Sequence, residues 1–148
     1  MTFDSALSSL KQGEFVMIHD SDGRENEIDE HIVRMRMHAG GLLCLAIDNS
    51  LAEKLQLKYM HNMLSSSNEL DEESKKMIMG TAPYGDHPTF SISINHKQTY
   101  TGITDRDRAL TIKEMSTLYK NENPKQYFNS TFKTPGHVPL LIASNGLL

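Results

Sequence analysis

The chain has 148 residues, a length typical of one compact domain with its own hydrophobic core. Fifteen Lys and Arg residues against nineteen Asp and Glu residues give a formal net charge of −4 at pH 7, so no excess of positive charge indicates nucleic-acid binding. The single cysteine, Cys44, excludes a disulfide within the chain. Because the N-terminus lacks the pattern of a secretory signal and the longest apolar run, 42–47, is too short to span a bilayer, we expect a cytoplasmic protein without a membrane segment.

The first third of the chain predicts two helices that alternate with two strands. Asp4 is expected to cap a short helix that ends at Gly13. The apolar run 15–19 predicts a buried strand, and the spacing of apolar residues over 31–39 predicts a second helix. A pair of glycines then separates this helix from a predicted strand at 42–47.

The middle of the chain predicts two short helices around a polar loop. Asp48 or Asn49 is expected to open a helix that includes Leu55. The polar, serine-rich stretch 59–68 predicts a loop. A charged amphipathic helix is expected to follow and to end at Gly80.

The last third predicts two strands with a helix between them. Residues 89–95 alternate strictly between apolar and polar side chains, which is the period of a half-buried strand. Thr104 or Asp105 is expected to cap a helix that carries apolar residues as far as Tyr119, and 138–143 predicts a final strand. Strands separated by helices predict an α+β (mixed α/β) fold, a single domain over 1–148 with a mixed sheet flanked by helices.

A dense group of charged residues follows the first predicted strand. Seven ionisable side chains lie within eleven residues: Asp20, Asp22, Arg24, Glu25, Glu27, Asp29 and Glu30. Carboxylates held this close either bind a cation or raise one another's pKa, and oxygen ligands without nearby cysteine favour a hard ion such as Mg²⁺. The alternative is a solvated acidic loop that only faces water.

Three further residues have two interpretations each. His137 follows Pro135 and Gly136, which predicts an imidazole at a sheet edge, either functional or bonded to a loop carbonyl. Cys44 lies within an apolar run, so inert core packing competes with a role as nucleophile. Thr101 leads from a strand toward a helix, where N–H groups and hydroxyls suit a phosphate or a sugar hydroxyl, or form an ordinary cap.

Four segments, in order along the chain, together resemble the 3,4-dihydroxy-2-butanone 4-phosphate synthases of riboflavin biosynthesis. Their sequences are DSDGRENEIDE, AGGLLCLA, YTGITDRDRALTI and FKTPGHVPLLIASNGLL. The resemblance implies that fold and a lyase that converts D-ribulose 5-phosphate to 3,4-dihydroxy-2-butanone 4-phosphate and formate. It also implies a metal-stabilised enediolate, Mg²⁺ or Mn²⁺ as cofactor, and a cytoplasmic homodimer.

The resemblance assigns roles to the residues already named. Glu25 matches the metal carboxylate, and Arg24, Glu25, Asp29 and Thr101 match substrate-binding positions. Glu25, Asp29, His137 and Cys44 match catalytic or site-lining positions, and Asp20, Asp22 and Glu27 fall in an acidic loop that closes over the ligand.

The chain departs from the family pattern in two places. A Gly-His-Thr-Glu segment, whose histidine is a second metal ligand in the family, would lie beyond Leu148, and about one strand is missing after Asp29. The sequence therefore leaves two alternatives to the active enzyme. One is a catalytically silent homologue that binds a sugar phosphate or a partner protein, and the other is a coincidental match around a surface loop.

Overall fold

The computed structural model describes residues 2–12, 14, 16, 43–78, 80–81, 85 and 87–143. These residues belong to two compact units, 1–43 and 44–148, each of which is considered by itself. The predicted helix 31–39, the acidic loop 20–30 and all but one residue of the predicted strand 15–19 lie outside the described residues. The prediction of a single domain stays a prediction.

In the first unit, the described helix is α1, Phe3–Lys11. Its cap is Thr2, whose Oγ1 accepts a hydrogen bond from the Ser5 N–H at 3.3 Å, so the prediction of Asp4 as the cap was wrong by two residues. Asp4 lies instead in the first turn, where its charge interacts favourably with the helix dipole.

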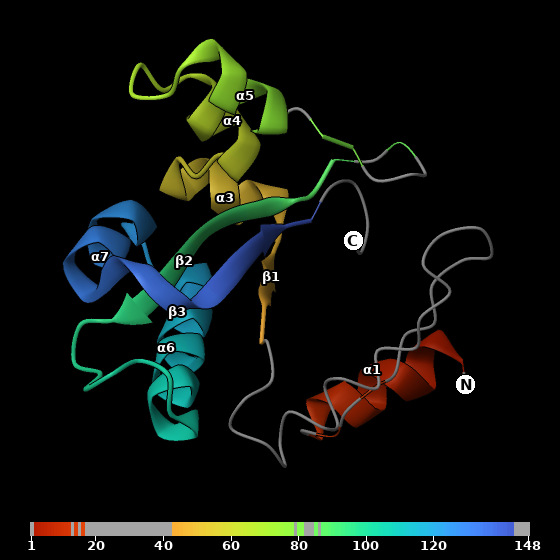
Figure 1. Cartoon of the computed structure of the whole chain (residues 1–148). Helices are drawn as coiled ribbons and strands as arrows, with labels where there is room; N and C mark the ends of the chain where they lie inside the picture. The colour runs from red at the N-terminus through yellow and green to blue at the C-terminus, as the bar shows by residue number, and fades with distance from the viewer. Residues whose placement is uncertain are drawn as a thin grey trace. The chain divides into compact units, whose positions relative to one another are not determined.

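The second unit contains a mixed sheet of three strands, β1 (Leu45–Ile47), β2 (Phe90–His96) and β3 (Phe132–Ile142). The strand order is β1-β3-β2, so β3 lies in the centre among the described strands, parallel to β1 and antiparallel to β2 (Figure 1). This arrangement confirms the predicted mixed sheet. The observed β1 is shorter than the predicted strand 42–47, and β3 begins six residues before the predicted strand at 138.

Helices and one 3₁₀ turn pack around this sheet. They are α3 (Asn49–Leu55), α4 (Met60–Ser65), α5 (Glu72–Ile78), α6 (Asp105–Thr117), the 3₁₀ turn η1 (Leu118–Lys120) and α7 (Pro124–Thr131). Buried residues of α3, α6 and α7 share one core cluster with the sheet, and α4 contacts β2. The core joins α3 residues such as Leu51 to sheet residues such as Leu140, and to Met115 of α6 and Phe128 of α7.

Local capping signals account for the helices that the sequence predicted well. The Asp48 carboxylate accepts from the Leu51 N–H at 2.8 Å and opens α3, and the Thr104 hydroxyl accepts from the Asp107 N–H at 3.2 Å and opens α6. One other prediction was wrong, because the stretch predicted as a loop, 59–68, contains α4. The sequence analysis also missed α7, which begins at Pro124 because proline is well suited to the first position of a helix.

The predicted apolar face of β2 is only partly correct. Ser91 is completely buried and donates its hydroxyl to the Lys58 carbonyl at 2.7 Å, whereas Phe90 is exposed. A register shift between Phe90 and Ser93 interrupts the regular alternation, and polar as well as apolar positions of the strand are buried. A buried hydroxyl on β2 is tolerated because its hydrogen bond is made.

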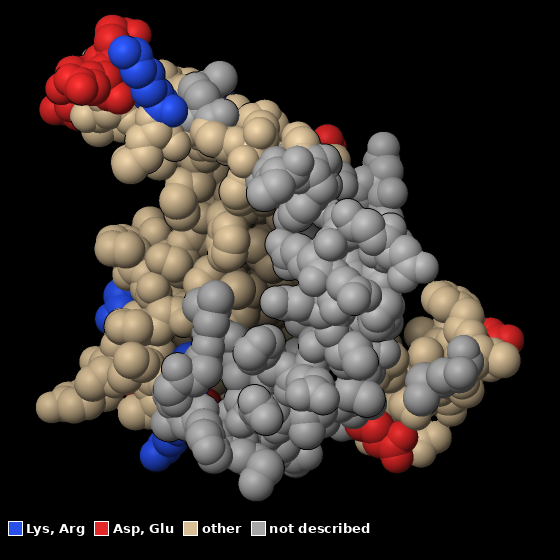
Figure 2. All heavy atoms as spheres, turned by 45° about the vertical axis from the view of Figure 1, so that its right-hand side comes forward, with Lys and Arg blue, Asp and Glu red and all other residues tan. Residues whose placement is uncertain are grey.

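The charged side chains of α5 lie on the surface. Glu72 and Glu73 are in its first turn and Lys75 and Lys76 in its last, and Glu72 pairs with Lys75 at 3.0 Å. They belong to the charged group at the top of Figure 2. Among the described residues, no helix has the length and apolar character needed to cross a membrane.

Candidate functional site

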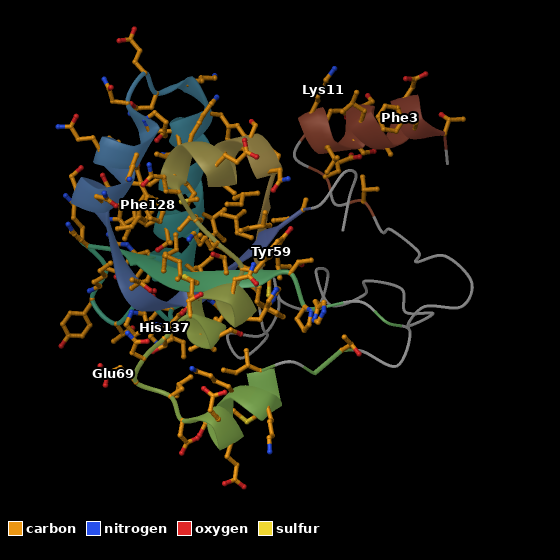
Figure 3. All side chains as sticks on the ribbon, turned by 90° about the horizontal axis from the view of Figure 1, so that it is seen from above. Phe3, Lys11, Tyr59, Glu69, Phe128 and His137 are labelled. Atoms are coloured by element: carbon orange, nitrogen blue, oxygen red, sulfur yellow. The ribbon has the colours of Figure 1, made fainter. Side chains whose placement is uncertain are left out.

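His137 lies in a four-residue bulge of β3. The pairing with β2 runs regularly from Ser93 with Pro139 to Ile94 with Val138, but the next partner of β2 is Lys133. Residues 134–137 are therefore left out of the strand register, and His137 is exposed at the bend of the strand (Figure 3). Because β3 is the central described strand, the prediction of a sheet edge was wrong, and the bulge is what frees this side chain.

Ser93 on the neighbouring strand binds the backbone and a hydroxyl of the bulge. Its Oγ accepts from the Gly136 N–H at 3.2 Å, and its carbonyl accepts from the Thr134 hydroxyl at 2.8 Å. The bulge also lies close against β2, because a methyl group on Gly136 would come within 2.0 Å of the Ile94 carbonyl carbon. These contacts replace the ladder hydrogen bonds that the bulge gives up.

Thr101 lies in a tight turn that the Asp107 carboxylate holds from the first turn of α6. Oδ2 accepts from the Gly102 N–H at 2.8 Å and the Thr101 N–H at 3.1 Å, and Oδ1 accepts from the Tyr100 N–H at 3.4 Å. The Thr101 hydroxyl is also within 3.3 Å of Oδ2. These hydrogen bonds, the one from Gly102 foremost, lower the pKa of Asp107.

Of the two interpretations of this turn, a ligand site with free N–H groups and an ordinary cap, the first is wrong for the N–H groups of Tyr100, Thr101 and Gly102, because all three donate to Asp107. The anion they bind is the chain's own carboxylate. What the turn presents outward is the exposed Thr101 side chain. Thr101 is therefore a residue placed by Asp107. Its hydroxyl donates to Asp107 Oδ2 at 3.3 Å and accepts from the Ile103 N–H at 3.4 Å, which leaves one lone pair of the oxygen for a ligand.

Asn95 connects the turn to the bulge. Its Oδ1 accepts from the His137 backbone N–H at 2.8 Å, and its Nδ2 lies 3.2 Å from His137 Nδ1. On its other side the amide lies against Gly102, where a methyl group would come within 2.0 Å of Nδ2. Gly102 also has a φ of +86°, which favours glycine. The structure thus brings Gly102 of the Thr101 turn and His137, 35 residues apart in sequence, to either side of one buried amide.

Cys44 immediately precedes β1 and is half-buried. Leu45 pairs with Leu140, so β1 begins at the end of β3 that is nearer to His137. Burial raises the pKa of the Cys44 thiol, which favours the neutral thiol over the reactive thiolate at neutral pH. This environment supports the packing interpretation of Cys44 more than the nucleophilic one.

The predicted acidic loop lies outside the described residues, namely Asp20, Asp22, Arg24, Glu25, Glu27 and Asp29. The described part of the chain contains no group of three or more His, Cys, Asp or Glu side chains that could hold a metal ion. The assignment of Glu25 as a metal ligand stays a prediction.

Sequence reasoning missed Ser93, Asn95 and Asp107. One signal was present for Asp107, because an aspartate in the first turn of a helix that follows a Thr-Gly turn can accept from the turn's N–H groups. Asn95 gave a weaker signal, a polar residue at the end of an alternating strand. Neither pattern identifies the residue that the side chain contacts. Asn95 and His137, for example, are brought together only by the pairing of β2 with β3.

A cleft of about 890 Å³ lies elsewhere in the second unit, between α3, η1 and α7. Lys54, Tyr119 and Lys125 are among the residues that line it, whereas Thr101 and His137 are not. Burial raises the pKa of the Tyr119 hydroxyl at its rim. The cleft and the His137 region are therefore separate features of the fold.

A model of the 3,4-dihydroxy-2-butanone 4-phosphate synthase family matches residues 4–148. The chain belongs to this family. The 3,4-dihydroxy-2-butanone 4-phosphate synthase of Methanothermobacter thermautotrophicus is 38% identical over 151 residues, which cover 95% of this chain and 66% of that protein. The Archaeoglobus fulgidus synthase is 36% identical over 160 residues, which cover 99% of this chain and 67% of that protein.

The fold agrees with solved structures of the same family. A crystal structure of 3,4-dihydroxy-2-butanone 4-phosphate synthase in complex with two magnesium ions matches with a TM-score of 0.63 and 26% identity, over 99% of this chain and 62% of that chain. The chain thus spans 62% to 67% of the length of these three relatives. The predicted family and the predicted mixed α/β fold are both confirmed.

Proposed function

We propose that the chain is a lyase of riboflavin biosynthesis that converts D-ribulose 5-phosphate to 3,4-dihydroxy-2-butanone 4-phosphate and formate. Membership of the synthase family supports this reaction class. The observation that carries the proposal is the convergence of Gly102, which follows Thr101 in the turn, and His137 on Asn95, because the turn and His137 come from two separate segments that resemble the family's motifs.

The exposed side chains of Thr101 and His137 suit a small polyhydroxylated substrate. A hydroxyl and an imidazole can both exchange hydrogen bonds with sugar oxygens, and the imidazole can hold or release a proton near neutral pH. The reaction requires several proton transfers on one small molecule, so more than one titratable group must surround it. We assign His137 to one of these transfers, and Asp29 and Glu25 of the acidic loop to others.

A relative of this chain binds two magnesium ions. We propose that Glu25 holds Mg²⁺ or Mn²⁺ here, that Arg24 and Asp29 contact the substrate, and that Asp20, Asp22 and Glu27 belong to a loop that closes over it. A divalent ion bound there would stabilise negative charge on vicinal oxygens of the sugar. We further propose that the active form is a cytoplasmic homodimer.

Release of formate tests the reaction directly. Purified, folded chain is incubated with D-ribulose 5-phosphate and Mg²⁺, and formate is measured with a coupled formate dehydrogenase. We expect formate to accumulate in proportion to enzyme, and to disappear when EDTA is added. Folded, metal-supplied protein that releases no formate would refute the lyase assignment, and calorimetry with the same substrate would then show whether the chain is a silent sugar-phosphate binder.

Glu25→Gln tests the assignment of the metal carboxylate. The variant keeps the size of the side chain and removes its charge, so we expect formate release to fall by at least about a hundredfold. Glu53→Gln on the exposed face of α3 is the matched control and should retain the parent rate. Full activity in Glu25→Gln would remove Glu25 from the proposed metal site.

A further inference from the structure

Asn95 is a buried polar residue whose side chain faces the ring of His137. Only 4% of Asn95 is exposed, and its amide group lies between the Thr101–Gly102 turn and the bulge of β3. A buried amide of this kind requires hydrogen-bond partners, and the structure supplies two from one residue, the backbone N–H and the ring Nδ1 of His137.

The backbone N–H of His137 fixes the orientation of the amide. A backbone N–H only donates, so the amide atom 2.8 Å from it must be the oxygen. The opposite orientation would place the NH₂ group against another donor. The oxygen and nitrogen of Asn95 are therefore assigned by the hydrogen-bond network.

The orientation of the amide also determines which nitrogen of the imidazole ring carries the hydrogen. With Oδ1 committed to the backbone, the group 3.2 Å from His137 Nδ1 is the NH₂ of Asn95, which can only donate. Nδ1 must then accept and carry no hydrogen. A neutral imidazole has one N–H, so the hydrogen resides on Nε2.

We propose that Asn95 is a positioning residue that holds neutral His137 in the tautomer with its hydrogen on Nε2. The tautomer itself does not depend on the proposed function; only its role in the reaction rests on that function. In that role, Nε2–H donates a hydrogen bond to a carbonyl or hydroxyl oxygen of the sugar phosphate, and the proton transfer assigned to His137 is donation of this hydrogen to that oxygen. Removal of a proton from carbon then falls to another group.

Gly102 is part of the same arrangement of Asn95 and His137. A side chain at this position would occupy the space of the Asn95 amide, since a methyl group would lie within 2.5 Å of its Nδ2, Cγ and Oδ1 atoms. The absence of a side chain at Gly102 lets the amide lie against the turn that presents Thr101. Asn95 thus orients the ring of His137 and also contacts the turn that presents Thr101.

Nitrogen NMR of the imidazole ring tests the tautomer without any assay of activity. The full chain is labelled with ¹⁵N, and long-range ¹H–¹⁵N correlations are recorded at about pH 8, where an unperturbed imidazole is neutral. The His137 signals are identified by their loss in His137→Gln. We expect Nδ1 to have the shift of a bare ring nitrogen and Nε2 that of a protonated one. A hydrogen on Nδ1, or averaged shifts from a tautomer mixture, would overturn the proposal.

Asn95→Asp supplies the matched perturbation. The carboxylate has nearly the same shape and still accepts the His137 backbone N–H, but it has no hydrogen to donate to Nδ1. We expect the hydrogen to move to Nδ1, with a corresponding exchange of the two nitrogen shifts. Asn62→Asp on the exposed face of α4 is the control and should leave the His137 spectrum unchanged. An unchanged spectrum in Asn95→Asp would also overturn the proposal.

Kinetics of the proposed reaction provide a second measurement. In Asn95→Ala the ring loses its fixed tautomer, so we expect kcat for formate release to fall by about tenfold, with KM changed much less. A parent chain that releases no formate refutes the proposed function and leaves the NMR result standing. A parent chain that is active, with kcat unchanged in Asn95→Ala, refutes the positioning role.

Discussion

The Thr101–Gly102 turn and the 134–137 bulge present their side chains by different means. The turn is held by the charged carboxylate of Asp107, which accepts several backbone N–H groups at once. The bulge is held by the neutral side chains of Ser93 and Asn95 on β2. The turn therefore depends on one ionised group, whereas the bulge depends on several separate hydrogen bonds to its neighbouring strand. Both structures contact Asn95, so we expect a substitution that displaces Asn95 to affect both of them.

Replacement of Gly102 is expected to have the largest effect, because it damages both structures. Gly102→Ala adds backbone strain at a φ of +86° and a methyl group within 2.0 Å of Asn95 Nδ2. We expect the free energy of unfolding to fall by more than about 2 kcal/mol, measured by urea denaturation, since strain and overpacking add.

Gly85→Ala is the matched control for this substitution. Gly85 has a similar φ of +95°, but a methyl group there would meet nothing within 4 Å. Its loss of stability should therefore be the smaller of the two. Equal losses in the two variants would show that backbone strain alone decides the result and that the contact with Asn95 is unimportant.

Removal of the charge on Asp107 is expected to loosen the turn selectively. The carboxylate of Asp107 offers two acceptor oxygens to the backbone N–H groups of the turn, whereas the amide in Asp107→Asn offers one. Some of these N–H groups therefore lose their hydrogen-bond partner. We expect a lower melting temperature, and faster amide hydrogen exchange at Thr101 and Gly102 than at Gly136. Asp71→Asn, which removes a similar carboxylate from the exposed start of α5, should leave exchange in the turn unchanged. Equal protection at all three amides would contradict the independence of the turn.

Loss of the Ser93 hydroxyl is expected to affect the bulge with a smaller cost. Ser93→Ala removes the acceptor of the Gly136 N–H, and we expect about 1 kcal/mol of destabilisation in urea denaturation. Ser130→Ala on the exposed face of α7 is the control and should cost less, because its hydroxyl bonds within its own helix. A loss in Ser93→Ala no greater than in this control would show that the bulge does not need that hydrogen bond.

The smallest expected effect is a difference in how the stability of the parent chain and of Asp107→Asn depends on acid pH. The folded pKa of Asp107 is lowered, so its contribution to stability is complete above its unfolded pKa of about 4 and is lost as the pH falls below that value through the folded pKa. We expect the stability of the parent chain to fall more steeply below about pH 4 than that of Asp107→Asn. Asp48 and Asp71, whose pKa values are also lowered by hydrogen bonds, maintain some pH dependence in both proteins. Parallel curves would contradict the role of Asp107.

The sequence by itself determined the features that depend on near neighbours. Asp48 and Thr104 begin their helices through hydrogen bonds three residues away, and the alternation over 89–95 was enough to predict β2. The family resemblance was likewise visible in short segments. The sequence did not predict α7, because the signals that end one helix before Pro124 also begin the next.

The tertiary structure decided how the site residues are arranged. The bulge exists because Val138 and Lys133 pair with adjacent residues of β2 although they are five positions apart on β3. The contact of Asn95 with His137 spans 42 residues and has no local signature in the sequence. Caps and periodicity follow from the fixed geometry of one segment, whereas register and the partners of a buried amide are set only when distant strands pack together.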